Sequence, residues 1–190
     1  DAFSGAEALG QTDDEKSNTL FLAGDTAFLM DSFADASTLY GRAADQYPKS
    51  ASAEAARFHQ ARSFGNAKLY SSAAETYGRL VKDFPNTQFI EDAALEWGVA
   101  LRNAGMNDQA LKCLHSFATS YPTSSHAPRA LMEAYQAAMA IGPDHISEAL
   151  ELLSRTIENY PESELFPHAI HQRAFVNFSQ GSYDDAVRDC

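Results

Sequence analysis

The feature that most constrains this chain is a proline preceded by an aromatic residue, which recurs at nearly constant spacing. Successive copies are 37, 37 and 39 residues apart. They are Tyr47-Pro48, Phe84-Pro85, Tyr121-Pro122 and Tyr160-Pro161. A period of this length is typical of one supersecondary unit, which buries its apolar face only by stacking on its neighbours. The sequence therefore predicts one elongated array of repeats rather than a globular domain.

Two slots before each proline predict the second helix of a repeat. Small residues stand twelve positions before the prolines, and large apolar residues stand eight positions before them. Because the two slots are four residues apart, they share one helix face. Small side chains let a neighbouring helix approach, and large ones fill the space between helices. The small residues are Ala36, Ala73, Ala110 and Ala149, and the large ones are Tyr40, Tyr77, Leu114 and Leu153.

The residues after each proline predict the start of the next helix. A hydroxyl two positions on can accept from the free N–H groups of a first turn, and an alanine eight positions on marks the close-packed helix face. We expect the two extra residues of the long repeat to lie in the Gly142-Pro143 turn, with Asp144 capping the following helix. The hydroxyl residues are Ser50, Thr87, Ser124 and Ser163, and the alanines are Ala56, Ala93, Ala130 and Ala169.

Charge and hydropathy narrow the class of partner. The chain has 26 acidic and 14 basic residues, for a net charge of −12, and its basic residues are not clustered. Nucleic acids need clustered cations to displace their counterions, so we expect no nucleic-acid binding. The longest apolar stretch, around Leu20 to Met30, is interrupted by Gly24 and Asp25 and is shorter than the ~20 residues that span a bilayer. Membrane insertion of this segment is therefore not expected.

The residues that could carry chemistry form no recognisable catalytic or metal site. His168 and His171 have a spacing that metals use, but no nearby Cys or carboxylate completes a tetrahedral set. The phosphate-binding loop, the Gly-x-Ser-x-Gly turn and the His-Glu-x-x-His helix are missing. Cys113 and Cys190 match no metal or redox spacing, which favours structural roles. We therefore expect a non-enzymatic protein without metal or cofactor.

The residue pattern at these positions resembles that of the tetratricopeptide repeat, whose second helix opens with Gly-x-aromatic-x-x-Ala. The run Gly181 to Ala186 is a complete copy. Phe33 to Ala36 and Tyr70 to Ala73 keep the aromatic residue and the alanine, whereas Gly105 to Ala110 lacks only the aromatic residue. The resemblance covers roughly residues 13–190. It implies an all-α, right-handed α-α superhelix of about five helix hairpins, the last one truncated.

The same register predicts the organisation of the chain. A flexible segment, 1–12, precedes the array, whose repeats are approximately 17–48, 51–85, 88–122, 125–161 and an incomplete 164–190. Because Ala186 occupies the slot of Ala149, the fifth second helix has only begun at Cys190. We expect the natural protein to continue and to bury this thiol. Left exposed, the thiol could form an intermolecular disulfide.

The resemblance also implies where a partner binds. In tetratricopeptide arrays the first helices line a concave groove that holds an extended peptide or a partner's helix. An apolar surface with a few guanidinium groups suits burial of apolar side chains and hydrogen bonds to carboxylates. Any one apolar residue can equally pack between helices, and Arg62 and Arg102 can equally pair with nearby acids. The predicted binding residues are Phe21, Asp25, Phe28, Phe58, Arg62, Leu95, Val99, Arg102, Met132, Gln136, Met139, His171 and Phe175, with Asn18, Asp92, Arg129, His168 and Phe178 in the wider set.

Two functions are consistent with these observations. The first is a scaffold that captures a protein segment in the groove and supports assembly of a complex. The Tyr-Pro-x-Ser variant resembles repeats of bacterial envelope proteins, such as the Tol-Pal-associated periplasmic protein and the outer-membrane assembly lipoprotein, and so implies an extracytoplasmic location. A cytoplasmic location stays open. The alternative is a structural spacer, or a segment that self-associates through the unfinished fifth repeat, with no ligand in the groove.

Overall fold

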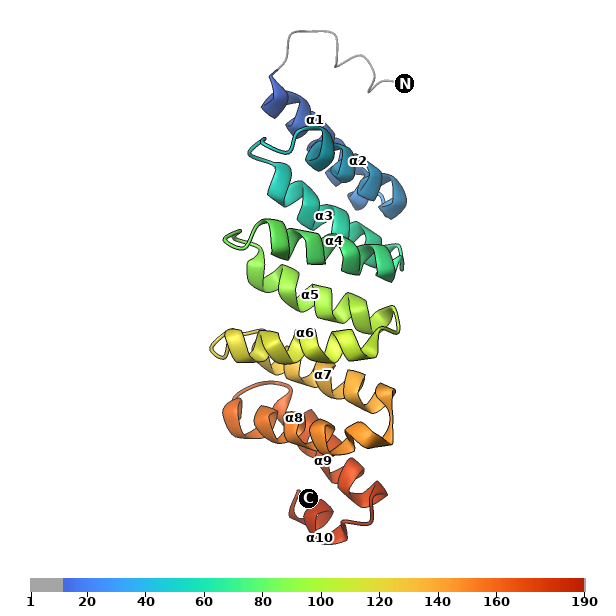
Figure 1. Ribbon diagram of the computed structural model, residues 1–190, viewed down its shortest axis with the longest axis vertical. Coiled ribbons are helices and arrows are strands. Elements are labelled where there is room, and N and C mark those ends of the chain that lie inside the picture. The colour runs from blue at the N-terminus through green and yellow to red at the C-terminus, as the bar shows by residue number, and fades with distance from the viewer. Residues whose placement is uncertain (1–11, 190) are drawn as a thin grey trace. The chain divides into compact units, whose positions relative to one another are not determined.

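The computed structural model describes residues 12–189, which fold into helices and turns without any strand. The all-α prediction is confirmed. The chain divides into two compact units, the first ending at Ala93 and the second beginning at Ala94. Within each unit, consecutive helices lie side by side and run in opposite directions (Figure 1). The predicted flexible segment 1–12, except Thr12, and the predicted role of Cys190 lie outside the described residues.

The first unit consists of two helix hairpins and the beginning of a third. α2 packs against both α1 and α3, so the two hairpins are stacked. Thr12 and Glu15 form a capping box that fixes the start of α1, because each side chain accepts from the other residue's backbone N–H. The helices are α1 (Asp13–Leu29), α2 (Phe33–Gln46), α3 (Ala53–Asn66) and α4 (Tyr70–Asp83).

The second unit continues the same pattern. Each helix from α7 to α9 packs against the helix before it and the helix after it. A short 3-10 helix, η2 (Pro143–His145), lies in the turn before α8. The helices are α5 (Ile90–Asn103), which contains the boundary between the units, α6 (Asn107–Ser120), α7 (Ala127–Ile141), α8 (Ile146–Asn159), α9 (Phe166–Ser179) and α10 (Tyr183–Arg188).

The small-residue slots form the core of both units, as the periodicity predicts. All eight alanines of the two small-residue slots are 0% exposed, and the four large partners are at most 4% exposed. The helices α2, α4, α6 and α8 each have, as their C-cap, the aromatic residue that precedes a proline. The predicted helix ends are therefore confirmed. Each aromatic cap is followed by a residue that cannot donate the next intrahelical hydrogen bond.

The hydroxyl residues after the prolines do not cap the first helices, contrary to prediction. The residues at the N-caps of α3, α7 and α9 make no side-chain capping bond. Instead, the hydroxyls of Thr87, Ser124 and Ser163 accept from the amide two residues on, at 3.4, 3.2 and 3.2 Å. This local bond stabilises the turn that precedes the helix rather than the helix itself. The Ser50 hydroxyl donates to the Ser17 hydroxyl at 2.8 Å.

The turns inside the hairpins share a positive φ at one slot. The slot has a positive φ in each hairpin: 57° at Asp31, 60° at Lys68, 77° at Gly105, 138° at Gly142 and 78° at Gly181. These values belong to the region that glycine adopts most easily, so Asp31 and Lys68 are held there at a cost.

The extra length of the fourth repeat lies in η2, directly after Gly142, which confirms the predicted position of the insertion. Asp144 does not cap the next helix, however. The N-cap of α8 is His145, without a side-chain capping bond, and its Nδ1 lies 3.0 Å from Glu148 Oε2. The tight 3-10 turn moves the helix start past Asp144 and so prevents the predicted cap.

Candidate protein-binding surface on the first helices

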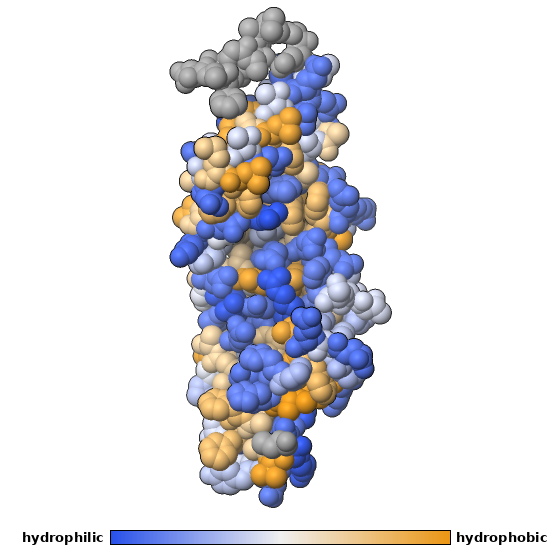
Figure 2. All heavy atoms as spheres, turned by 180° about the vertical axis from the view of Figure 1, so that it is seen from behind, coloured by the Kyte–Doolittle hydropathy of each residue, from blue (hydrophilic) through white to orange (hydrophobic). Residues whose placement is uncertain are grey.

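The predicted binding residues all lie on the first helix of a hairpin, namely α1 and α3 in the first unit and α5, α7 and α9 in the second. We call the surface formed by these helices the first-helix face and describe it unit by unit. The back view shows apolar side chains at the surface of both units, interspersed with hydrophilic ones (Figure 2). Burial and contacts separate the residues that can meet a partner from those that pack inside.

An aromatic cluster occupies the first-helix face of the first unit. The Phe21 ring meets the rings of Tyr40 and His59 edge to face, with centroids 5.3 and 5.4 Å apart. The Phe58 ring stacks on Phe89 at 4.9 Å and meets His59 edge to face at 5.7 Å. Phe21, Phe58 and His59 are each half-buried. The rings therefore hold one another in place while part of their apolar surface stays accessible.

Asp25 is fixed by the tyrosine of this cluster. The Tyr40 hydroxyl donates to Asp25 Oδ1 at 2.6 Å. Burial raises the pKa of Tyr40 well above its ordinary value, and the hydrogen bond to Asp25 raises this pKa further. Tyr40 therefore stays a neutral donor to the carboxylate. The predicted binding residue Asp25 is half-buried and oriented by this bond, so its charge contributes to the local field at a defined position.

Arg62 is the cation of this surface. Its guanidinium carbon lies 4.8 Å from the centroid of the Phe28 ring, and the Phe28 ring in turn meets Phe33 at 5.2 Å. The residue is exposed. A cation over an aromatic face is attracted to its quadrupole, so the long side chain is held beside Phe28 rather than free in solvent. Arg62 on α3 and Phe28 on α1 thus join the two first helices of this unit.

His59 is a component of the surface that the sequence reasoning missed. His59 is not among the predicted binding residues, yet it is half-buried between Phe21, Tyr40 and Phe58. Burial lowers the pKa of His59, while the nearby Asp25 acts in the opposite direction. The lowered pKa favours the neutral ring at neutral pH. In the sequence, only the position of His59 directly after Phe58 on α3 indicated that it could belong to this surface.

Three of the predicted binding residues in the second unit are buried. Leu95 is 1%, Met132 4% and Val99 9% exposed. They fill space between helices, so this conformation does not present them to a partner. The same slots are half-buried or exposed in the first unit, at Phe21, Phe58, Asp25 and Arg62. The aliphatic side chains lie within the packed layer, whereas the aromatic rings and the charged groups extend beyond it.

Arg102 is paired with an acid, which was one of the two alternatives open at that position. Arg102 Nε donates to Glu133 Oε2 at 2.7 Å, which connects α5 to α7. Arg129 and Glu96 connect the same two helices through a second contact of 2.7 Å. Both pairs are partly exposed, so each adds little to stability because solvent screens it. Each ion pair also occupies its arginine, so neither guanidinium group can bind a partner without giving up its pair.

The remaining predicted residues of the second unit lie at the surface. Gln136 and His171 are exposed, Met139 is 37% exposed and Phe175 is 61% exposed. Gln136 and Met139 lie on α7, and His171 and Phe175 lie on α9. The exposed Phe178 ring meets Tyr183 of α10 at 5.4 Å, so the apolar surface continues from α9 onto α10.

Residues 12–189 contain no group of three or more His, Cys, Asp or Glu side chains arranged to hold a metal. Nor is any helix in this range long and apolar enough to span a bilayer. Cys113 is a free, half-buried thiol whose Sγ lies 3.7 Å from the carbonyl oxygen of Ala94. Burial raises the pKa of Cys113 to about 12. A thiol in this environment is a poor nucleophile at neutral pH.

The sequence matches the family model of the tetratricopeptide repeat over residues 55–87 and 92–124. The resemblance to this repeat is therefore confirmed for these two segments. No curated protein matches the sequence at a significant level. The resemblance to envelope proteins receives no support from these comparisons.

Solved structures with a similar fold cover nearly the whole chain. A structure of MamA has a TM-score of 0.74 at 16% identity and covers 91% of this chain and 87% of its own. MamA 41-end from Desulfovibrio magneticus RS-1 has a TM-score of 0.71 at 16% identity, covering 91% and 90%. A putative kinesin light chain from Podospora anserina, described as having nearly identical TPR-like repeats, has a TM-score of 0.70 at 14% identity, covering 94% and 93%. At these identities the likeness shows the fold, which is that of tetratricopeptide-repeat solenoids.

Proposed function

We propose that the chain is a non-enzymatic scaffold that captures a segment of a partner protein on the first-helix face of its first unit. The fold is one in which stacked repeats provide extended surfaces for protein partners. The observation that carries the proposal is the joint presence of half-buried aromatic rings and an exposed, oriented guanidinium group. Phe28 and Arg62 supply this combination directly, at 4.8 Å.

The chemistry of this surface defines the kind of segment that would bind. Aromatic and arginine side chains provide most of the binding energy in protein interfaces because they bury large areas around fixed polar groups. Phe21 and Phe58 offer apolar area, whereas Arg62 can form a bidentate pair with a carboxylate. The complementary partner segment carries apolar side chains beside an Asp or Glu. Asp25 already accepts from the Tyr40 hydroxyl. Its negative charge would repel a second acidic residue of the partner segment placed close to that hydroxyl.

The first experiment identifies the partner without assuming its name. A photo-crosslinking amino acid replaces Arg62 on the first-helix face, or Arg79, an exposed arginine on the second helix α4 of the same unit. Cross-linking in cells, followed by mass spectrometry, should give an adduct at position 62 that is absent at position 79. Equal adducts at both positions, or adducts at neither, would contradict capture on the first-helix face.

The second experiment tests the chemistry with that partner. Arg62→Glu should weaken binding by at least tenfold, because it replaces attraction of a carboxylate by repulsion, whereas Arg79→Glu should leave binding within about twofold. Both residues are exposed, so neither change should alter helicity. Isothermal titration of the two variants gives the comparison. Binding that is insensitive to Arg62→Glu would exclude the proposed role of this guanidinium group.

A specific observation favours the alternative, self-association through the last hairpin. Phe178, Tyr183 and Val187 are 62%, 60% and 73% exposed, which leaves apolar area on α9 and α10. A second copy of the chain could bury this surface. The mass in sedimentation equilibrium should then rise with concentration, and Val187→Glu should abolish the rise. A constant mass would remove this alternative and leave the partner-binding function unaffected.

A location in the bacterial envelope stays a prediction that rests on the Tyr-Pro-x-Ser resemblance alone. Fractionation of the source cells, with the chain detected in the periplasmic or the cytoplasmic fraction, tests it independently of any binding experiment.

A further inference from the structure

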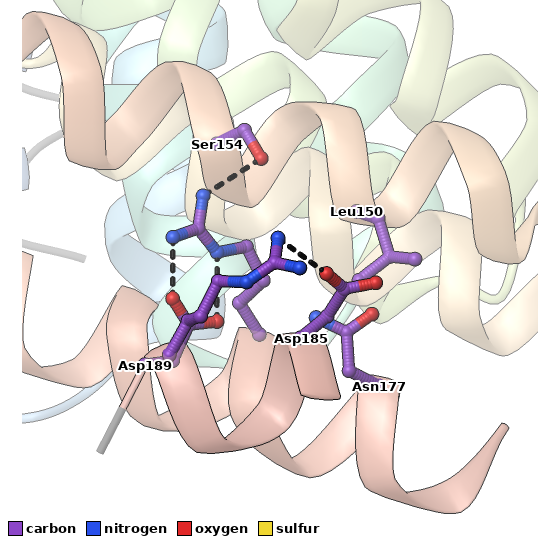
Figure 3. A pocket seen from close by; sticks show the side chains of 7 residues that line it. Leu150, Ser154, Asn177, Asp185 and Asp189 are labelled. Atoms are coloured by element: carbon purple, nitrogen blue, oxygen red, sulfur yellow. Dashed lines mark hydrogen bonds and ion pairs between the residues drawn. The ribbon is translucent and has the colours of Figure 1, made fainter. Parts of the chain in front are cut away.

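A polar pocket of about 290 Å³ lies among α8, α9 and α10 in the second unit (Figure 3). It is a different surface from the first-helix face. Ser154 of α8, Arg173 and Asn177 of α9, and Asp189 near the end of α10 contribute its polar groups. The pocket has room for roughly ten water molecules, which suits a short peptide segment and is too small for a folded element.

The fifth repeat differs from the other four at the slots that build this pocket. In the register of the prolines, Asn177 occupies the slot of Ala27, Phe64, Leu101 and Ala138, all of them apolar. Asp189 occupies the slot of Leu39, Thr76, Cys113 and Leu152, none of them charged. The same array thus shows that the fold does not need polar side chains at either position. Their presence here calls for a reason other than stacking of hairpins.

The charged groups of the pocket neutralise one another. The Arg173 guanidinium donates to both carboxylate oxygens of Asp189, at 2.9 and 2.5 Å, and to the Ser154 hydroxyl at 3.0 Å. Arg188 pairs with Asp185 at 2.9 Å. Figure 3 marks both pairs with dashed lines among the side chains that line the pocket. Two cations facing two anions give no net charge, so the pocket favours neither an anion nor a cation as its ligand.

Asn177 is the polar group without a partner. The residue is only 9% exposed, and its side-chain amide makes no hydrogen bond to any residue between 12 and 189. The close-up shows this amide near Asp185 and Leu150 (Figure 3). Because the amide borders a hollow with room for water, water can satisfy it in the free protein, and a ligand that enters the pocket must replace those hydrogen bonds.

We propose that this pocket binds the main chain of a short peptide segment of a partner protein, with the Asn177 side chain pairing to one peptide group. An asparagine amide carries a carbonyl acceptor and an NH₂ donor side by side, and a peptide group offers the complementary donor and acceptor. A neutral ligand of this kind fits the balanced charges of Arg173, Arg188, Asp185 and Asp189. The site is independent of the first-helix face and adds a second point of contact for a partner.

The test uses the full chain and a defined probe, the capped neutral peptide acetyl-Gly-Ala-Gly-amide. Titration followed by NMR should shift the side-chain amide signals of Asn177 and the backbone signals of Ser154 and Asp185 in a saturable way. Asn177→Leu, which introduces the residue of the equivalent slot Leu101, should abolish the saturable shifts of Ser154 and Asp185. Asn159→Leu, a change at an exposed asparagine of α8, should leave them intact.

Each other outcome counts against the proposal. Saturation that survives in Asn177→Leu would show that the amide does not hold the peptide. Saturation by sodium phosphate or acetate instead of the peptide would assign an anion site to the two arginines. Linear shifts without saturation would mean that the pocket binds no peptide main chain. Should Asn177→Leu unfold, Asn177→Ala, which introduces the residue of the slots Ala27 and Ala138, provides the same comparison with a smaller side chain.

Discussion

Replacing a glycine by alanine is expected to have opposite effects at two sites of this chain. A Cβ built on Gly98 lies 2.4 Å from Leu114 Cγ and 2.5 Å from its Cδ2. Leu114 is 0% exposed, so its side chain has no free space into which to move. A Cβ at Gly65 meets no heavy atom within 4 Å. The added methyl group would therefore meet packed atoms at position 98 and open space at position 65.

The magnitudes follow from two opposing terms. Forcing an extra carbon into a packed core costs about 1–3 kcal/mol. Exchange of a helical glycine for alanine gains about 0.4–1 kcal/mol, because the unfolded chain loses conformational freedom. We expect Gly98→Ala to destabilise the protein by a net ~1–2 kcal/mol and Gly65→Ala to stabilise it by about 0.4–1 kcal/mol. Gly24→Ala should follow Gly98→Ala, since its Cβ would lie 2.8 Å from the Tyr40 ring.

Urea unfolding followed by far-UV circular dichroism measures both effects. The midpoint should fall for Gly98→Ala and rise for Gly65→Ala, with similar slopes, since a changed midpoint at constant slope reports stability. If Gly98→Ala stabilises the protein as much as Gly65→Ala does, close packing of α5 on α6 at this slot is refuted.

Three further predictions follow from the buried polar groups. Tyr40→Phe should lower the free energy of unfolding by about 1.5–3 kcal/mol, because it removes a hydrogen bond to a charged group; the same urea titration measures this. His59 has a lowered pKa, so its contribution to stability is complete above about pH 6.5 and is lost as the pH falls toward the lowered value. His59→Phe should flatten that part of the stability-versus-pH curve, and an unchanged slope would contradict the assignment. In a Cys190→Ser background, Cys113 should react with iodoacetamide at pH 8 only after unfolding, because its raised pKa leaves little thiolate; rapid labelling of the folded protein would show that the thiol is not shielded.

The sequence was sufficient to predict the helices and their packing slots because both depend on local spacing. Ala36 and Tyr40 are four residues apart in a period that repeats, and a residue in such a slot has the same neighbours in each hairpin. The ends at Tyr47 and Phe84 were equally predictable, since the proline that follows removes a donor. The local hydrogen bonds of Thr87 were not, because a hydroxyl near a helix start can serve either the helix or the preceding turn.

The candidate surface was predicted less completely, because burial depends on the particular side chains that surround a slot. Phe58 and Leu95 occupy the same slot, yet the ring is half-buried and the leucine is 1% exposed. His59 was overlooked since two of its three ring partners, Phe21 and Tyr40, come from α1 and α2, more than fifteen residues away. The pocket at Asn177 was missed because it needs three helices together, although its departure from the apolar slot of Leu101 was visible in the sequence.

The similar φ at Asp31, Lys68, Gly105 and Gly181, between 57° and 78°, affects how such an array can change. Because these four hairpins bend with a similar φ at one defined residue, a segment excised between two of these bends ends with a backbone angle close to the one at which its neighbours begin. Whole hairpins are then interchangeable building blocks, and duplication or loss of one leaves matching junctions. The fourth hairpin shows that even the length of the bend is adjustable, since its two additional residues coil into η2 without moving the bend itself.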